Sequence, residues 1–128
     1  DRLVVLDNAL KSADDSDEFR ERKQAFQLLW RLSTDYWMAL AEGKGDFEAR
    51  KIFGKNEYAS NEGEIAGGNK RAKSARTFEY KGENIEMMKH LKYGVKDSAS
   101  ETIRIHFEWD AEDKKIVIGY CGPHLPHK

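Results

Sequence analysis

Helical periodicity dominates the first half of the chain. From Phe19 to Leu40 the apolar positions recur at steps of three and four, so they form one stripe along a helix. This spacing predicts a single long helix over about residues 17–42. Two tryptophans, Trp30 and Trp37, lie on the stripe, and we expect both to be buried in the core.

Shorter helices are expected on either side of the long one. The apolar cluster at 3–10 suits a short helix. Asp15 followed by Glu18 has the spacing of a capping box, which would open the long helix. Residues 46–53 suit one further short helix, with an aspartate at its start. The sequence therefore predicts a helical part over residues 1–54.

Strand-like alternation replaces the helical pattern in the second half. Residues 55–75 are rich in Asn, Gly and Ser, which predicts a long loop. Thr102–Trp109 then alternates strictly between apolar and polar residues, as a half-buried strand does. Four strands are expected, at 76–80, 85–93, 102–109 and 115–121.

These elements together define the expected fold. The class is α+β, with N-terminal helices packed on a four-stranded antiparallel sheet over about residues 76–121. A C-terminal tail covers residues 122–128. A length of 128 residues fits a single domain, 1–128.

The hairpin formed by the last two strands can be aligned from the sequence alone. Pairing Asp110 with Lys115 places Trp109 opposite Ile116 and brings the large apolar residues to one face. A slip by one residue would separate them. The alignment continues with the pairs Phe107–Ile118, His106–Gly119, Ile105–Tyr120 and Arg104–Cys121.

Polar side chains gather on the other face of this sheet. The strand at 85–93 contributes His90 and Lys92 to the face that carries Arg104 and His106. We expect these four side chains, together with Glu108, to line one shallow groove on the polar face. An ordinary solvated sheet also shows alternating charges, so the pattern alone does not establish a site.

This residue set suits RNA cleavage without a metal ion. A histidine can take the proton from a ribose 2′-hydroxyl or protonate the departing 5′-oxygen, and His106 is the preferred acid or base. Arg104 and Lys92 would stabilise the phosphorane-like transition state. His90, Glu108 and His124 complete the candidate catalytic residues. Glu62 and the basic loop at 70–73 could cover a substrate, although nothing in the spacing requires it.

The composition bears on whether the protein binds a membrane and on the cellular compartment in which it works. The chain is 39% hydrophobic and 35% charged, and no apolar run approaches the length of a transmembrane helix, so no membrane partner is expected. No signal peptide is evident, and Cys121 is the single cysteine, which fits a reducing, cytoplasmic setting. The chain opens at Asp1 without a methionine, which leaves open whether it is trimmed or part of a longer protein.

Charge is divided unevenly along the chain. Residues 1–69 hold 10 Lys/Arg against 14 Asp/Glu, and residues 70–128 hold 12 against 9. The first part therefore carries −4 and the second +3. A surface that binds the phosphates of RNA is expected in the second part.

Three alternatives remain open from the residues. A zinc site could use His90, His106, Cys121 and His124, although no cofactor or metal is expected. The same face could instead bind a nucleic acid or a protein without catalysis. In the third alternative, the long helix forms an oligomer and the sheet is merely solvated.

A resemblance to a known group adds to the ribonuclease hypothesis. The segments that carry it are 89–94, 103–107 and 116–120, in which His, Lys and Arg alternate with apolar residues. In this pattern the chain resembles the RelE-like ribonuclease toxins and the wider barnase- and colicin-like RNases, although it is longer and less basic than a typical RelE-like toxin. The ending at 118–125 is also similar to C-terminal domains of uncharacterised bacterial proteins linked to conflict or phage defence. The resemblance implies a metal-independent endoribonuclease, of toxin or defence-effector type, with an antitoxin as a further partner.

Overall fold

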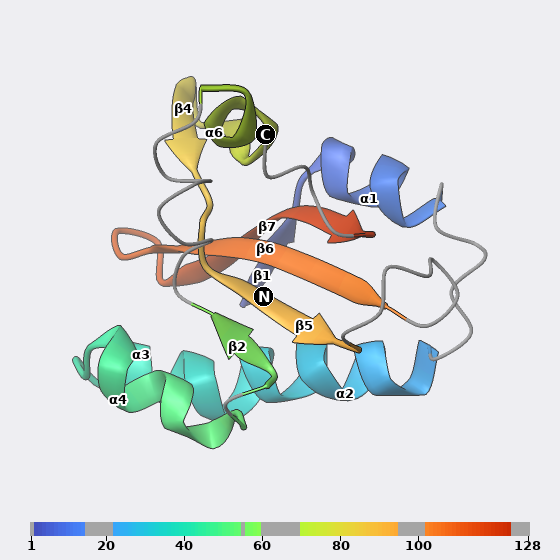
Figure 1. Cartoon of the computed structure of the whole chain (residues 1–128). Coiled ribbons are helices and arrows are strands. Elements are labelled where there is room, and N and C mark those ends of the chain that lie inside the picture. Colours follow the sequence, from blue (N-terminus) through green and yellow to red (C-terminus); the bar gives the residue numbers. More distant parts are fainter. Residues whose placement is uncertain (1, 15–21, 55, 60–69, 95–101, 124–128) are drawn as a thin grey trace.

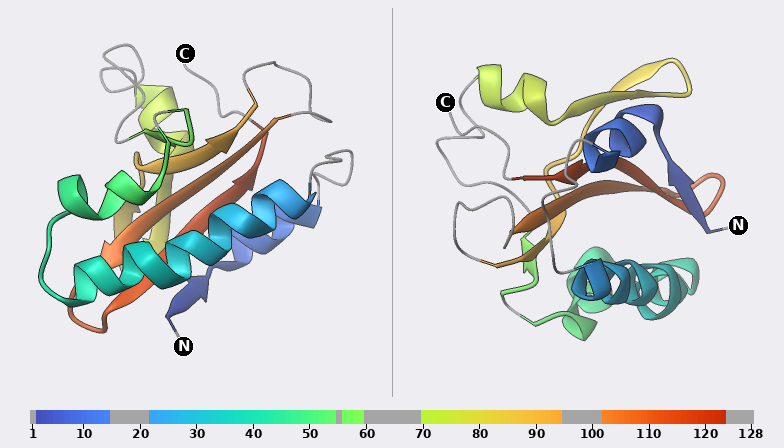
Figure 2. Two further views of the ribbon diagram at one scale, coloured as in Figure 1. Left: turned by 90° about the horizontal axis from the view of Figure 1, so that it is seen from below. Right: turned by 90° about the vertical axis from the view of Figure 1, so that its right-hand side faces the viewer.

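A mixed sheet with the long helix on one face and a smaller helix-and-hairpin unit on the other forms the centre of the protein (Figures 1 and 2). The computed structural model describes residues 2–14, 22–54, 56–59, 70–94 and 102–123. The α+β class and the packing of a long helix on a sheet are confirmed. The sheet itself differs from the expected four antiparallel strands.

The main sheet has five strands, and one of them is parallel to its neighbour. In spatial order the strands are β1 (Leu3–Val5), β7 (Lys115–Gly122), β6 (Ile103–Asp110), β5 (His90–Tyr93) and β2 (Tyr58–Ala59). β1 pairs parallel to β7, and the other pairs are antiparallel. The prediction of a helix from residue 3 is therefore wrong at its start. A short apolar run is compatible with a helix or a strand, and here the residues form a strand because they pair with β7.

Helix α1 (Asp7–Asp14) completes the outer edge of β7. β1 pairs with β7 only as far as Ile118. Beyond that point, Asn8 Nδ2 donates to the Gly119 carbonyl at 3.0 Å, and the Cys121 amide donates to Ser12 Oγ at 3.1 Å. Side chains of α1 thus satisfy backbone groups that would otherwise form an open sheet edge.

The segment predicted as one strand at 85–93 is divided in the structure. β3 (Thr77–Tyr80) and β4 (Glu83–Glu86) form a separate two-stranded hairpin, and β5 follows after Met87–Lys89. Lys81 and Gly82 have φ values of 53° and 79° at the turn, the left-handed conformation that tight hairpins need.

A short helix precedes this hairpin within the region predicted as a loop. α6 (Lys70–Ala75) and β2 both fall in the range 55–75, of which 60–69 lie outside the described residues. We call residues 70–86, which are α6 with the β3–β4 hairpin, the cover segment. It lies on the face of the main sheet opposite the long helix (Figure 2).

The predicted long helix is confirmed over residues 22–41. It runs through α2 (Arg22–Arg31), a π-helical stretch (Leu32–Tyr36) and α3 (Trp37–Ala41); its expected first residues, 17–21, lie outside the described part. α4 (Asp46–Ala49) and a 3₁₀ turn (Arg50–Ile52) confirm the shorter helix. No helix in the described ranges has the length and apolar character required to cross a membrane.

The buried face of the long helix differs from the predicted stripe. Leu28, Leu32 and Tyr36 are buried against the sheet, whereas Trp30 is 60% exposed. Two residues along an α-helix correspond to a rotation of about 200°, so Trp30 lies on nearly the opposite side from Leu28. The expectation that Trp30 belongs to the core is therefore wrong, while Trp37 is half-buried and packs on the core.

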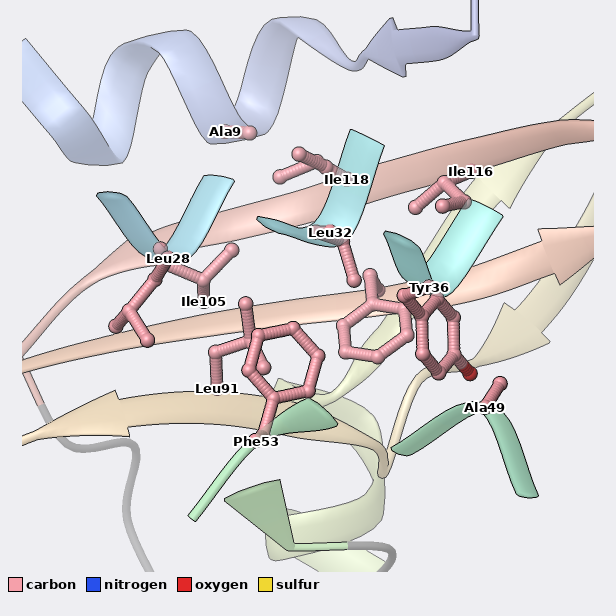
Figure 3. Close-up of a cluster of buried hydrophobic side chains, with 11 residues drawn as sticks. Ala9, Leu28, Leu32, Tyr36, Ala49, Phe53, Leu91, Ile105, Ile116 and Ile118 are labelled. Atoms are coloured by element: carbon pink, nitrogen blue, oxygen red, sulfur yellow. The ribbon is translucent and has the colours of Figure 1, made fainter. Parts of the chain in front are cut away.

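The core fills the space between this helix and the sheet (Figure 3). Phe107 lies at its centre, edge-on to Tyr36 at 5.5 Å and to Tyr58 at 6.2 Å between ring centroids. Asp46 Oδ1 accepts hydrogen bonds from the hydroxyls of both tyrosines, at 2.5 and 2.6 Å. Burial and the bond to Asp46 raise the pKa of both phenols, which therefore remain neutral donors. The network ties α4 to the sheet.

A β-bulge changes the predicted register of the last hairpin. The predicted pairs Asp110–Lys115 and Trp109–Ile116 are present. Between His106 and Phe107 the register then shifts, so that His106 pairs with Tyr120. Gly119 becomes the extra residue of the bulge, and the residues after it exchange faces. The predictions that His106 pairs with Gly119, Ile105 with Tyr120 and Arg104 with Cys121 are wrong for this reason.

Candidate functional site

Strand pairing brings the four principal candidate residues together. In the antiparallel pair β5–β6, His90 lies directly opposite His106, and Lys92 lies opposite Arg104. Residues two apart in a strand share a face, so all four side chains extend from the same side of the sheet. The sequence-based prediction of their common face is confirmed.

The third strand adds a residue that the sequence did not assign to this face. Because of the bulge, Tyr120 of β7 continues the row that contains His90 and His106, and its ring lies edge-on to His106 at 5.8 Å. Gly119 was the available signal, since a glycine inside a strand often marks a bulge. Burial raises the pKa of the Tyr120 phenol to about 12.

Arg76 is a further cation of this layer that sequence reasoning missed. It is fully buried at the start of β3, and its charge acts on Tyr120, where it partly offsets the rise of the pKa. Its backbone carbonyl accepts a hydrogen bond from the Met87 amide at 2.7 Å. Nothing in the local pattern distinguishes Arg76 from the other basic residues of the second half.

The two imidazoles stack and have defined tautomers. Their ring centroids are 4.6 Å apart and their planes are inclined by 18°. Nδ1 of His90 is 2.9 Å from the Met88 carbonyl oxygen, and Nδ1 of His106 is 2.8 Å from that of Met87. Since a carbonyl oxygen can only accept, both Nδ1 atoms carry the proton. Nε2 is therefore the nitrogen of each ring that can exchange a proton.

The predicted groove was open to solvent, but in the structure most of its side chains are buried. His106 is 0% exposed and His90 is 3% exposed, and Arg104 is also buried. The cover segment lies over this face of the sheet (Figure 2), and its Phe78, together with Met87 just after it, packs against Gly119. The expectation of a solvated polar face is therefore wrong: residues far along the chain cover it.

Lys92 and Arg104 form the next row beside the histidines. Arg104 Nη1 donates to the carbonyls of Tyr93 at 3.2 Å and Ile103 at 3.0 Å, which fixes the guanidinium at the sheet. Lysine and arginine are the side chains that commonly bind phosphate groups in proteins.

The other candidate residues lie elsewhere or outside the described ranges. Glu108 shares the strand face but forms an ion pair with Lys89, and its Oε1 also accepts from the Trp109 amide at 3.0 Å. The Glu108 carboxylate is therefore paired with Lys89, which does not belong to the Lys92–Arg104 row. His124 and Glu62 lie outside the described residues.

The structure separates the ligands of the alternative zinc site. Cys121 packs against the core between the sheet and the long helix, on the opposite face from His90 and His106. Burial raises the pKa of this thiol to about 11, which disfavours the thiolate that zinc would need. Within the described ranges, no three His, Cys, Asp or Glu side chains are grouped to hold a metal ion.

Sequence and fold were compared with known proteins. No family model, curated protein or solved structure matches this chain. The resemblance to RelE-like and barnase-type ribonucleases therefore stays a prediction. The arrangement of the residues themselves must carry any proposal of function.

An acidic hydrogen-bond network fastens the cover segment to the sheet. Asp110 Oδ2 accepts from the Tyr80 hydroxyl at 2.8 Å and from Lys81 Nζ at 3.0 Å. Its Oδ1 accepts from the amides of Glu112 and Asp113. These bonds, that of Tyr80 first, lower the pKa of Asp110 to about 2. The network borders a hollow of about 380 Å³ between the two hairpins.

Acid is expected to weaken this attachment. Because the pKa of Asp110 in the folded protein, about 2, is lower than its ordinary value of 3.8, its contribution to stability is present above about pH 4 and is lost as the pH falls toward 2. Asp110→Asn should therefore be less stable than the wild type at neutral pH, with a difference that shrinks in acid. Urea unfolding at several pH values measures this. Asp35→Asn, on the exposed side of the helix, is the control, and a constant difference for Asp110→Asn would contradict the prediction.

Proposed function

We propose that this protein cleaves RNA without a metal ion, using the row of histidines and the adjacent row of cations. The observation that carries the proposal is the β5–β6 register, which sets His90 opposite His106 and Lys92 opposite Arg104. Two imidazoles, the side chains most often used as acid or base, thus lie beside two cations of the kind that bind phosphate. This is the set of groups that attack by a ribose 2′-hydroxyl requires.

In the proposed reaction the histidine row transfers protons and the Lys92–Arg104 row stabilises negative charge. One imidazole accepts the 2′-hydroxyl proton at Nε2 while the 2′-oxygen attacks phosphorus, and the same ring returns that proton to the 5′-oxygen as the bond from phosphorus to this oxygen breaks. The products are a 2′,3′-cyclic phosphate and a 5′-hydroxyl. Lys92 and Arg104 stabilise the extra negative charge of the transition state.

The complete burial of His106 supports His90, rather than His106, as the acid or base in this proposal. His106 is enclosed between His90 on one strand and Tyr120 on the next, and it has no exposed surface. Two stacked imidazoles resist being protonated together, so His106 sets the charge state and orientation of its neighbour. His90 contacts the substrate, and His106 is a positioning residue.

In this proposal the cover segment moves to expose His90, because the segment lies over the same face of the sheet (Figure 2). The histidines are bonded to the carbonyls of Met87 and Met88, in the short link between β4 and β5. This link joins the cover segment directly to the catalytic strand. A substrate phosphate therefore reaches His90 when the hairpin separates from the sheet, and the Asp110 network resists that movement.

Cleavage assays in EDTA test this proposal. The wild type should cut a single-stranded RNA, leave DNA of the same sequence intact, and release a 2′,3′-cyclic phosphate. DNA is the control because it lacks the attacking 2′-hydroxyl. Failure to cut any RNA, or cleavage that needs an added divalent metal ion, would contradict the proposal.

A non-catalytic binding module is the second candidate. The full burial of His106 favours it, because holding β5 against β6 is by itself a sufficient role for a stacked and hydrogen-bonded pair. The same assay separates the two functions. Salt-sensitive binding of RNA with no product, together with normal binding by His90→Asn, would support the binding module.

A further inference from the structure

Two large aromatic side chains are exposed side by side on α2. Phe26 is 65% exposed and Trp30 is 60% exposed, and their rings stack with centroids 6.4 Å apart and planes inclined by 18°. Ring faces presented to solvent in this way are unusual for a folded domain and commonly mark a binding surface. The pair lies one turn apart on the side of the helix turned away from the core.

A shallow hollow with a fixed cation at its border accompanies the pair. Phe26, Gln27, Trp30 and Arg31 line a space of about 440 Å³. Arg31 is held by Glu57 through two hydrogen bonds of 3.0 and 2.6 Å, which raises the pKa of the guanidinium and fixes its position. Gln27 adds an amide that can both donate and accept hydrogen bonds.

The charge of α2 distinguishes between the occupants of this surface. Residues 1–69 are acidic overall, but α2 (Arg22–Arg31) holds no carboxylate. Arg31 is paired with Glu57, and the exposed Arg22 and Lys23 are the further cations of this helix. A second copy docked through the same helix would place like charges against one another. A polyanion with flat rings is complementary to both the cations and the exposed aromatic faces.

We propose that Phe26 and Trp30 form a stacking platform for single-stranded RNA, with the cations of α2 binding its backbone. Bases stack on the rings, and Gln27 and Arg31 lie within the hollow beside them. The platform lies on the opposite side of the sheet from the cover segment (Figure 2). It is therefore a second contact with nucleic acid, and it holds whether or not His90 is catalytic.

Binding of an uncleavable RNA tests the platform apart from catalysis. The probe is a short, fluorescently labelled 2′-O-methyl oligouridylate, which lacks the attacking hydroxyl, and its affinity is measured by anisotropy in EDTA. Phe26→Ala/Trp30→Ala is expected to weaken binding by about tenfold or more, since base stacking is lost. Phe47→Ala is the matched control, because Phe47 is 64% exposed on a different helix, and it should bind like the wild type.

Two further measurements identify the occupant. Lys23→Gln should reduce the dependence of RNA affinity on salt, as loss of one phosphate contact does. An abasic oligonucleotide of the same length should bind the wild type about tenfold or more weakly, because it has no rings to stack.

Four results would overturn the platform. One is unchanged affinity of the double variant, and another is equal binding of the abasic chain. A third is a dimer, seen by analytical ultracentrifugation, that the double substitution dissociates and RNA leaves intact. The fourth is tighter binding of a polyglutamate peptide than of RNA, which would indicate an acidic protein partner.

Discussion

His90→Asn is expected to slow RNA cleavage by about 10²–10⁴-fold, the range that a general acid or base contributes. Asparagine is chosen because its Nδ2–H can donate to the Met88 carbonyl as histidine Nδ1–H does. The variant loses Nε2 and keeps the hydrogen bond that attaches β5 to the preceding link. Its loss of activity should therefore reflect chemistry rather than unfolding. Initial rates in EDTA, with circular dichroism as a check of folding, measure the effect.

His106→Asn serves as the matched substitution in the same row. It preserves the bond to the Met87 carbonyl and removes the stacked imidazole. If His106 positions its neighbour, this variant should change the pH dependence of cleavage more than its maximal rate. Wild-type cleavage by His90→Asn would remove His90 from the mechanism. An unchanged pH profile for His106→Asn would remove the positioning role.

Gly119→Ala is expected to lower the free energy of unfolding by about 1–3 kcal/mol, as overpacking of a close contact does. A Cβ at this position would lie 2.5 Å from Phe78 Cδ2 and 2.8 Å from Met87 Sδ. Phe78 is held within the cover segment by its pairing with Ile85 in β4, so its ring cannot move away freely. Urea unfolding gives the change in stability. Gly45→Ala is the control, since a Cβ there meets nothing within 4 Å.

A second substitution distinguishes this clash from a general effect of alanine. The double variant Gly119→Ala/Phe78→Leu should lose less stability relative to Phe78→Leu than Gly119→Ala loses relative to the wild type, because leucine removes ring atoms from the contact. Because Phe78 belongs to the cover segment, Gly119→Ala should also ease access to His90 and raise kcat/KM for RNA. Equal stability of Gly119→Ala and the wild type would show that the bulge tolerates a side chain.

Strand parity was the part of the site that local sequence determined. The alternation of Arg104 and His106 with Ile103, Ile105 and Phe107 fixes which side chains share a face, because successive residues of a strand point in opposite directions. The same reasoning placed His90 and Lys92 beside them. The α+β class and the long helix followed from periodicities of two and of three to four, which also depend only on neighbouring residues.

Tertiary structure decided whether that face is open. The cover segment lies over the same face of the sheet (Figure 2), where Phe78 of the segment and Met87 just after it contact Gly119 across more than thirty residues of sequence. Because of the bulge at Gly119, Tyr120 lies in the histidine row and Cys121 packs against the core. Both results depend on contacts between distant segments, to which a local pattern of hydrophobic and polar residues is insensitive.

The same limit explains the errors in the first half of the chain. Leu3–Val5 forms a strand because it pairs parallel to β7. Trp30 faces outward because Leu28, Leu32 and Tyr36 form the side of the helix that packs on the sheet. Sequence by itself determined the type of the main elements and the side of the sheet on which His90, Lys92, Arg104 and His106 lie. Only the tertiary structure decided which faces are covered, because burial is set by long-range packing.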